Sequence, residues 1–210
     1  MNNTSYKNPE GLTEAGHTTT ARDLATLATR LMRDFPEYVP TYAIKKYRYP
    51  GTPAANDSNR NLLLFKDPTV DGLKTGWTEK AGYCLVTSAN RVDMRLISVV
   101  LGSASPAIRT AETEKLLDYG FRFFETQSVN DISHQVPVYK SKIGNIKVGV
   151  ADSSYLTLPR NQFKYTTQTI NLTGDLIAPI KQGDQVGTLA ISFNDEDIAT
   201  LPLIALENAD

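Results

Sequence analysis

The stretch Val70-Asp71-Gly72-Leu73-Lys74-Thr75-Gly76-Trp77-Thr78 decides the fold. The residues around Leu73 predict extended structure, in which successive side chains alternate between the two faces of a sheet. Lys74 and Thr75 then point to opposite faces, so one can enter a cleft while the other supports it from behind. Gly76 lets a ligand approach the main chain closely, and the hydroxyls of Thr75 and Thr78 can donate to a carboxylate or carbonyl oxygen. The stretch therefore indicates an edge strand beside an active site.

A Lys-Thr-Gly triplet would also suit a surface lysine before a turn, so the flanking sequence has to decide between the two interpretations. Three stretches, at about 70–77, 81–89 and 94–101, have the length and composition of strands. Gly82 and the Ala89-Asn90-Arg91 stretch leave room for turns. The segment predicts an antiparallel meander with Lys74 on its first strand.

Helical patterns lie on both sides of this meander. Thr20 suits an N-cap and Asp23 the first turn of a helix, while Pro36 and Pro40 end the pattern. Apolar residues at spacings of three and four form one stripe, which we interpret as core packing: Leu24, Leu27, Ala28, Leu31, Met32 and Phe35. A second helical pattern runs from 106 to 125.

Basic and aromatic residues are interleaved at 41–58: Tyr42, Lys45, Lys46, Tyr47, Arg48 and Tyr49. Such interleaving can indicate stacking of nucleic-acid bases. The chain as a whole is close to neutral, with a net charge of −1, so we favour a solvated edge strand and its loop and expect no nucleic-acid partner.

The composition changes after about Thr126. Valine, threonine and isoleucine then alternate with polar residues in short runs at 135–140, 145–150, 154–158, 165–172, 186–193 and 199–206. Many short strands separated by turn residues predict a small β-sandwich. The sequence thus predicts an α+β chain with one domain at 1–127 and an all-β domain at 128–210.

Composition excludes several classes of protein. Apolar residues make up 40% and charged residues 21% of the 210 residues, an ordinary globular balance. The residues after Met1 are polar, so we expect no signal peptide in this chain, and its apolar runs are too short to span a bilayer. Cys84 is the one cysteine and is expected to be a buried, inert thiol. His17 and His134 lack ligand-like neighbours, so we expect neither a metal nor a cofactor.

The order of segments around the triplet resembles a known family. Asn59-Arg60-Asn61-Leu62-Leu63 precedes it, and Lys80-Ala81-Gly82-Tyr83-Cys84-Leu85-Val86 and 95–102 follow it. This order is similar to that of the serine D-alanyl-D-alanine carboxypeptidases, the low-molecular-mass penicillin-binding proteins, in which Lys-Thr-Gly is the third active-site motif. The resemblance extends from Asn8 to the end of the chain.

This resemblance implies a fold, a reaction and a location. The first domain would be part of a catalytic domain like that of the class A β-lactamases and penicillin-binding proteins, followed by the all-β domain. A serine would attack the amide before the terminal D-Ala of a peptidoglycan stem pentapeptide, and water would release the acyl-enzyme. The same serine reacts with β-lactams. The family implies a periplasmic enzyme, peripheral to the inner membrane.

The resemblance also implies roles for individual residues. Lys74 would hold the terminal carboxylate of the substrate and support proton movement, and Thr75 would hydrogen-bond that carboxylate. Trp77 would supply a backbone N–H to the oxyanion hole, while its side chain is either a cleft wall or a surface aromatic. Arg60 and Arg109 match arginines near the substrate carboxylate, although each could be an ordinary helix-surface or ion-pair arginine.

The chain departs from the family pattern at its nucleophile. The family requires Ser-x-x-Lys and then Ser-x-Asn, and neither occurs in a suitable place; 110–113 and Ser141-Lys142 are no substitute. In relatives both motifs lie before the point that Met1 occupies, and relatives often continue beyond the equivalent of Asp210 into a membrane-anchoring helix. We therefore expect the C-terminal portion of such an enzyme, inactive unless an N-terminal partner supplies the nucleophile.

Two alternatives remain open. The chain could be a non-catalytic module that binds cell-wall components or proteins through its β domain, which would require the incomplete first domain to fold alone. It could also be a relative of the β-lactamases or transpeptidases. The additional β-sandwich favours the carboxypeptidase, since ordinary class A β-lactamases have none.

Overall fold

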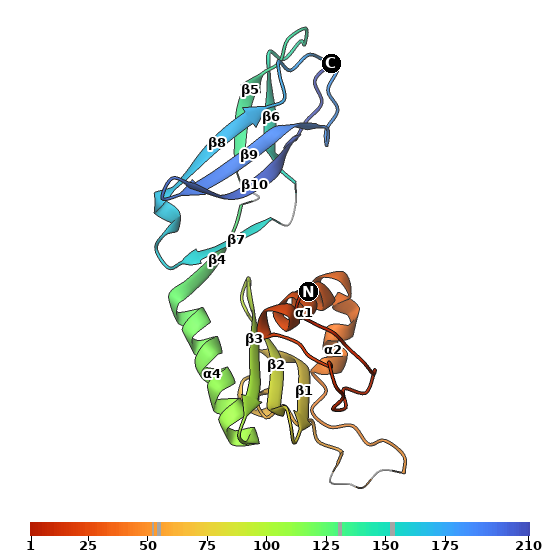
Figure 1. Cartoon of the computed structure of the whole chain (residues 1–210). Coiled ribbons are helices and arrows are strands. Elements are labelled where there is room, and N and C mark those ends of the chain that lie inside the picture. Colours follow the sequence, from red (N-terminus) through yellow and green to blue (C-terminus); the bar gives the residue numbers. More distant parts are fainter. Residues whose placement is uncertain (52, 54–55, 130–131, 152–153) are drawn as a thin grey trace. The chain divides into compact units, whose positions relative to one another are not determined.

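The computed structural model of the protein describes residues 1–51, 53, 56–129, 132–151 and 154–210. The chain divides into two compact units, Met1–Arg122 and Phe123–Asp210 (Figure 1). The first unit combines helices with an antiparallel sheet, and the second consists mainly of strands. The predicted α+β class is thereby confirmed. In the described part of the chain, no helix is long and apolar enough to cross a membrane.

The sheet of the first unit is the predicted meander. β1 (Val70–Thr78), β2 (Gly82–Arg91) and β3 (Met94–Ser103) are antiparallel in the order β1-β2-β3, so β1 lies at an edge. Gly82 begins β2 with φ +67, and a Cβ there would lie 3.0 Å from the Ser103 carbonyl oxygen. The close approach of β2 and β3 at this end of the sheet therefore requires glycine.

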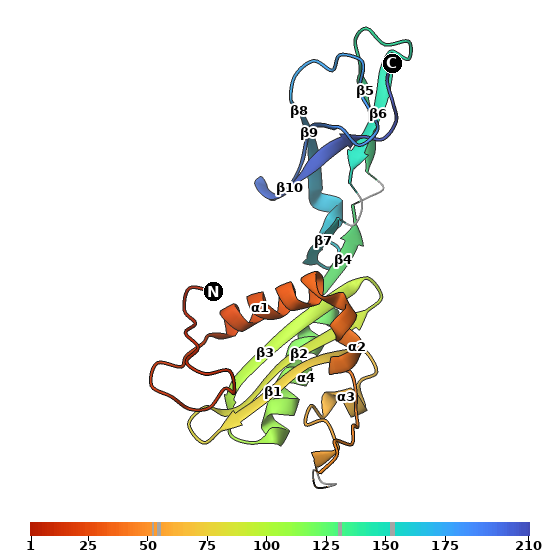
Figure 2. The same cartoon turned by 90° about the vertical axis from the view of Figure 1, so that its right-hand side faces the viewer.

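Helices cover both faces of this sheet, α1 and α2 on one side and α4 on the other (Figures 1 and 2). α1 (Ala21–Asp34) begins as predicted, because the Thr20 hydroxyl accepts a hydrogen bond from the Asp23 N–H. The helix ends before η1 (Pro36–Tyr38), which leads into α2 (Val39–Tyr42).

The apolar stripe of α1 is only partly buried. Ala28 and Met32 are buried, as core packing requires, but Leu27 is 43% exposed and Phe35 is 50% exposed. The interpretation of the whole stripe as core packing is therefore wrong for these two side chains. Two of the six side chains of the stripe thus remain largely exposed.

The opposite face carries α3 (Leu63–Lys66) and α4 (Pro106–Phe123). Leu63, Leu117 and Phe121 form the core of this layer together with Leu85 of β2. The N-terminal half of α4 instead buries polar residues, Arg109 among them. The predicted helix at 106–125 ends at Phe123, where the chain becomes extended.

The predicted edge strand at 41–58 does not form in the residues that are described there. The segment makes an isolated bridge between Lys46 and Ser58, supported by a hydrogen bond from the Tyr47 N–H to the Asp57 carbonyl of 2.8 Å. Arg48 pairs with Asp57 within the same loop. The segment pairs with itself rather than with the meander, so it is a loop and not a strand of the sheet.

The second unit contains seven strands among its described residues; six of them confirm the predicted short strands, and the first begins within the residues predicted as helix. The seven strands are β4 (Phe124–Ser128), β5 (Ser133–Pro137), β6 (Asn145–Val150), β7 (Tyr155–Pro159), β8 (Thr166–Leu172), β9 (Gln185–Phe193) and β10 (Glu196–Ala205). Five form one sheet in the order β5-β6-β10-β9-β8, and β4 pairs with β7; η3 (Phe163–Tyr165) precedes β8. Ile146, Val148, Leu189 and Leu203 are fully buried in its core. The unit therefore has a hydrophobic core of its own.

Candidate active site

The register of β1 and β2 determines what lies beside each residue of the triplet. Lys74 is opposite Val86, and Thr75 is opposite Leu85. Leu96 of β3 packs against Gly120 of α4, and strand alternation assigns Leu85, and therefore Thr75, to this same α4 face. The preceding lysine thus belongs to the face that α1 covers. The arrangement agrees with the predicted division of the two side chains between opposite faces.

Lys74 is exposed at the edge of the sheet. Its Nζ donates a hydrogen bond of 2.6 Å to the carbonyl oxygen of Thr75. No carboxylate of the described residues forms an ion pair with it. The ammonium group is therefore tethered to its own strand and can still pair with an anion that approaches the edge.

The residues after Lys74 differ in how open they are. Gly76 is exposed, and a Cβ there would meet only Cys84 Cβ at 3.8 Å, so internal packing does not require glycine. Trp77 is 58% exposed and stacks on Tyr83 with ring centroids 5.7 Å apart. The Thr78 hydroxyl accepts a hydrogen bond from the Ala81 N–H, so its oxygen stabilises the turn.

Arg109 of α4 is almost completely buried, with 4% of its surface exposed. Its guanidinium donates to the Cys84 carbonyl at 3.3 Å and to the Arg60 carbonyl at 2.9 Å, while Nε is buried without a hydrogen-bond partner among the described residues. The described residues place no carboxylate within ion-pair distance. Burial lowers the pKa of Arg109. A buried cation without a counter-ion is costly, and its field therefore favours an anion nearby.

An irregularity in the sheet makes this contact possible. The register between β2 and β3 shifts between Tyr83 and Leu85, at the position of Cys84, whose carbonyl accepts from Arg109. Irregularities of this kind release a backbone group from the ladder and are common beside active sites. The position opposite Cys84 on β1 is Gly76, so the charge of Arg109 acts directly behind the triplet.

The structure joins Arg60 to this site only through its backbone carbonyl, because its side chain is exposed. The neighbouring Asn61 was not singled out from the sequence, yet it is buried and donates to the Gly72 carbonyl at 3.0 Å. It also accepts from the Leu63 N–H. Asn61 thus ties the segment before α3 to β1. The sequence signal that could have identified Asn61 is its position immediately before an apolar run.

Cys84 is half-buried rather than fully buried, so the prediction of a buried thiol is wrong in degree. It is free, and its Sγ contacts the Ala81 carbonyl at 3.6 Å. The residues that the structure describes contain no cluster of His, Cys, Asp or Glu suited to a metal ion.

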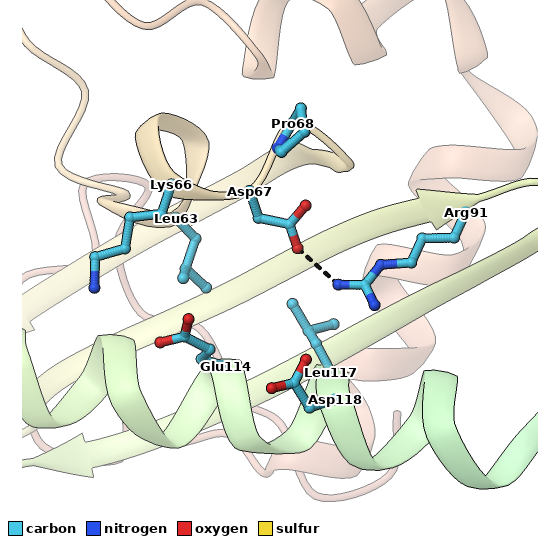
Figure 3. A pocket seen from close by; sticks show the side chains of 8 residues that line it. All are labelled: Leu63, Lys66, Asp67, Pro68, Arg91, Glu114, Leu117 and Asp118. Atoms are coloured by element: carbon cyan, nitrogen blue, oxygen red, sulfur yellow. Dashed lines mark hydrogen bonds and ion pairs between the residues drawn. The ribbon is translucent and has the colours of Figure 1, made fainter.

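A separate pocket of about 240 Å³ lies between α4 and the connection from α3 to β1 (Figure 3). The Arg91 guanidinium pairs with Asp67 at 2.9 Å and lies 4.2 Å from the Phe121 ring. The pocket is lined by Leu63, Lys66, Asp67, Pro68, Arg91, Glu114, Leu117 and Asp118. None of these residues belongs to the triplet, so this pocket is not the candidate active site.

Comparison with known proteins is decisive for the family. Residues 1–105 match the family model described as D-alanyl-D-alanine carboxypeptidase, and residues 121–210 match the C-terminal domain of penicillin-binding protein 5. The chain belongs to the D-alanyl-D-alanine carboxypeptidase family. The resemblance inferred from the sequence is thereby confirmed.

Individual carboxypeptidases agree with this assignment along the whole chain. DacC of Escherichia coli (strain K12) is 40% identical over 217 residues, which cover 100% of this chain and 53% of DacC. DacF of Bacillus subtilis (strain 168) is 34% identical, over 99% of this chain and 55% of DacF. The chain therefore spans about half the length of the curated relatives it matches.

Solved structures give the same result for the fold. Penicillin-binding protein 5 from Haemophilus influenzae superposes with a TM-score of 0.77 at 32% identity, over 98% of this chain and 61% of that chain. Penicillin-binding protein D2 from Listeria monocytogenes, solved in a cefotaxime-bound form, has a TM-score of 0.51 at 33% identity, over 56% of this chain and 48% of that chain.

Proposed function

We propose that this chain carries one wall of the active site of a D-Ala-D-Ala carboxypeptidase, an enzyme that removes the terminal D-Ala from peptidoglycan stem pentapeptides. The observation that supports it is a pair of cations without carboxylate partners in the described residues, Lys74 in front of the edge strand and Arg109 behind it. Two such charges favour a ligand that ends in a carboxylate, as a stem peptide does.

Each residue of the wall then has a role that its environment allows. Lys74 pairs with the substrate carboxylate and stabilises charge during acyl transfer. Thr75 donates its hydroxyl to the same carboxylate from the opposite side of the edge strand, and Gly76 leaves the main chain open to the substrate. The N–H of Trp77 contributes to the oxyanion hole. Arg109 adds positive potential from behind the strand.

The remaining residues of the proposed site contribute at its margin. Thr78 stabilises the turn beside the triplet through its contact with Ala81. Arg60 leaves its side chain free to meet the outer part of a peptide, because only its carbonyl is engaged with Arg109.

The nucleophile has to come from elsewhere, because the chain contains no Ser-x-x-Lys motif. The lysine of the triplet cannot replace an activated serine, so covalent catalysis is absent without it. We propose that this chain alone is inactive and that a segment bearing Ser-x-x-Lys and Ser-x-Asn completes the site. The expected location is the periplasm, where stem peptides and β-lactams are encountered.

Intact mass spectrometry after incubation with penicillin tests the proposal. The purified chain alone should gain no adduct. A separately produced fragment bearing Ser-x-x-Lys and Ser-x-Asn should gain one penicillin per molecule only when this chain is present. The Lys74→Met chain serves as the matched control and should reduce the rate of adduct formation.

Two results would overturn parts of the proposal. An adduct on this chain alone would identify a nucleophile here and refute its inactivity. No adduct on either component, with both folded, would show that the wall does not support acyl transfer, and the binding-module alternative would take its place.

A further inference from the structure

Tyr83 lies between the two most distinctive side chains of the candidate site. It is opposite Trp77 in the β1–β2 register, and their rings are 5.7 Å apart at an interplanar angle of 35°. The Arg109 guanidinium carbon also lies 5.9 Å from the centre of the Tyr83 ring. Tyr83 therefore contacts both the exposed indole and the buried cation.

Arg109 needs such a neighbour because its charge is otherwise poorly compensated. Two backbone carbonyls accept from its terminal nitrogens, and no described residue forms a hydrogen bond with its Nε. A cation within about 6 Å of an aromatic ring centre is attracted by the negative face of the ring, most strongly where water is excluded. The Arg109 guanidinium is thus held by the Tyr83 ring together with the two backbone carbonyls.

The Tyr83 ring affects the position of the Arg109 guanidinium as well as its stabilisation. Arg109 projects from α4, whereas Tyr83 and Cys84 belong to β2, which pairs with the triplet strand. The ring and the Cys84 carbonyl together fix the guanidinium behind Gly76. Without the ring, Arg109 would keep only its carbonyl contacts, and its orientation toward the edge of β1 would be less restricted.

We propose that Tyr83 is a positioning residue, which holds the Arg109 guanidinium where its charge meets the terminal carboxylate of the ligand. This inference rests on the proposed function of the site. The contact uses the face of the ring and not the hydroxyl, so phenylalanine should serve equally well at position 83.

The chain carries its own reporter for this proposal, since Trp77 is the single tryptophan. Its fluorescence can be followed while the chain is titrated with an acylated peptide ending in D-Ala-D-Ala carboxylate, or with the same peptide ending in a carboxamide. The wild-type chain should bind the carboxylate about tenfold more tightly, as expected for hydrogen bonds to a charged group.

Three variants separate positioning from stability. Tyr83→Leu should reduce the preference for carboxylate over carboxamide by about fivefold, because the cation–π contact is lost, with little change in carboxamide binding. Tyr83→Phe should keep the full preference. Tyr139→Leu, which removes an exposed tyrosine of the second unit, is the matched control. Circular dichroism checks the folding of each variant, and Tyr83→Ile replaces Tyr83→Leu if the latter does not fold.

The outcomes distinguish this inference from the proposed function. If Tyr83→Leu keeps the wild-type preference, the positioning role is wrong while the proposed function stands. If Tyr83→Phe loses the preference as well, the hydroxyl and not the ring is responsible, which also overturns the inference. If the wild-type chain does not prefer the carboxylate at all, both the proposed function and the inference fail.

Discussion

At the residue scale, the proposed site depends on a lysine, Lys74, whose one hydrogen bond among the described residues is to the neighbouring carbonyl. Lys74→Met keeps the length of the side chain and removes its charge. Because Lys74 is exposed, the free energy of unfolding should change by less than about 0.5 kcal/mol. The rate of penicillin acylation in the complemented complex should fall by about 10- to 100-fold, the value of a hydrogen bond to a charged group. Equal acylation rates for the two chains would contradict the assigned role of Lys74.

A second residue, Asp67, gives a prediction about pH. Burial raises the pKa of this carboxyl. Hydrogen bonds from Thr69 and the Arg91 guanidinium together lower the pKa by more than burial raises it, so it lies below the ordinary value. A depressed pKa contributes stability above the pKa of the unfolded state and loses it as pH falls through the folded value. Asp67→Asn should therefore be less stable than wild type at pH 7, and the difference should shrink as pH falls below the ordinary aspartate pKa of about 4.

Urea denaturation across this pH range measures the effect of Asp67→Asn. Asp118→Asn is the control, because Asp118 lines the same pocket and has no hydrogen bond or ion pair with another described residue. Its free energy of unfolding should stay close to that of wild type, because an exposed side chain without such a partner contributes little. A difference between wild type and Asp67→Asn that stayed constant from pH 7 to pH 3 would refute the linkage to this carboxyl.

At the scale of elements, the turn from β1 to β2 sets the register of the site. Gly82 has φ +67, and a Cβ there would lie 3.0 Å from the Ser103 carbonyl oxygen. Gly82→Ala should lower the free energy of unfolding of the first unit by about 2–3 kcal/mol, the sum of strain at positive φ and displacement of β3. Gly11→Ala has a similar φ of +76 and nothing within 4 Å of its Cβ, so it should cost only the strain. Equal losses in thermal denaturation would exclude a role for the close approach.

The elements also explain what the sequence could and could not predict. The strands were predictable because apolar alternation and turn residues are local signals, as in β8 and β9. The segment around Tyr47 was predicted wrongly as an edge strand, since a strand needs a neighbouring edge and this segment bonds to its own loop. The burial of Arg109 was not predictable, because it depends on the irregularity at Cys84 and on a helix 25 residues further along the chain.

At the scale of the whole molecule, the two units differ in how complete they are. The second unit encloses its own core, with Ile146, Val148 and Leu203 fully buried. In the first unit, Leu27 and Phe35 of α1 remain about half exposed. Apolar surface that stays exposed contributes nothing to the free energy of folding of the first unit. We expect residues 123–210 to fold as an isolated fragment, with dispersed amide resonances in its NMR spectrum.

The incompleteness of the first unit leads to a calorimetric prediction for the whole chain. Two transitions should appear, with the first unit unfolding at the lower temperature, since the second has the fuller core. A fragment that supplies Ser-x-x-Lys and binds only the folded first unit should raise the lower transition by mass action and leave the upper one unchanged. Leu27→Ser should weaken this rise if the fragment covers the exposed stripe of α1, whereas Thr29→Ser, on the exposed side of the same helix, should not. A single transition, or a fragment that shifts both transitions, would mean that the two units stabilise each other. The exposed side chains of α1 would then not explain the lower stability of the first unit.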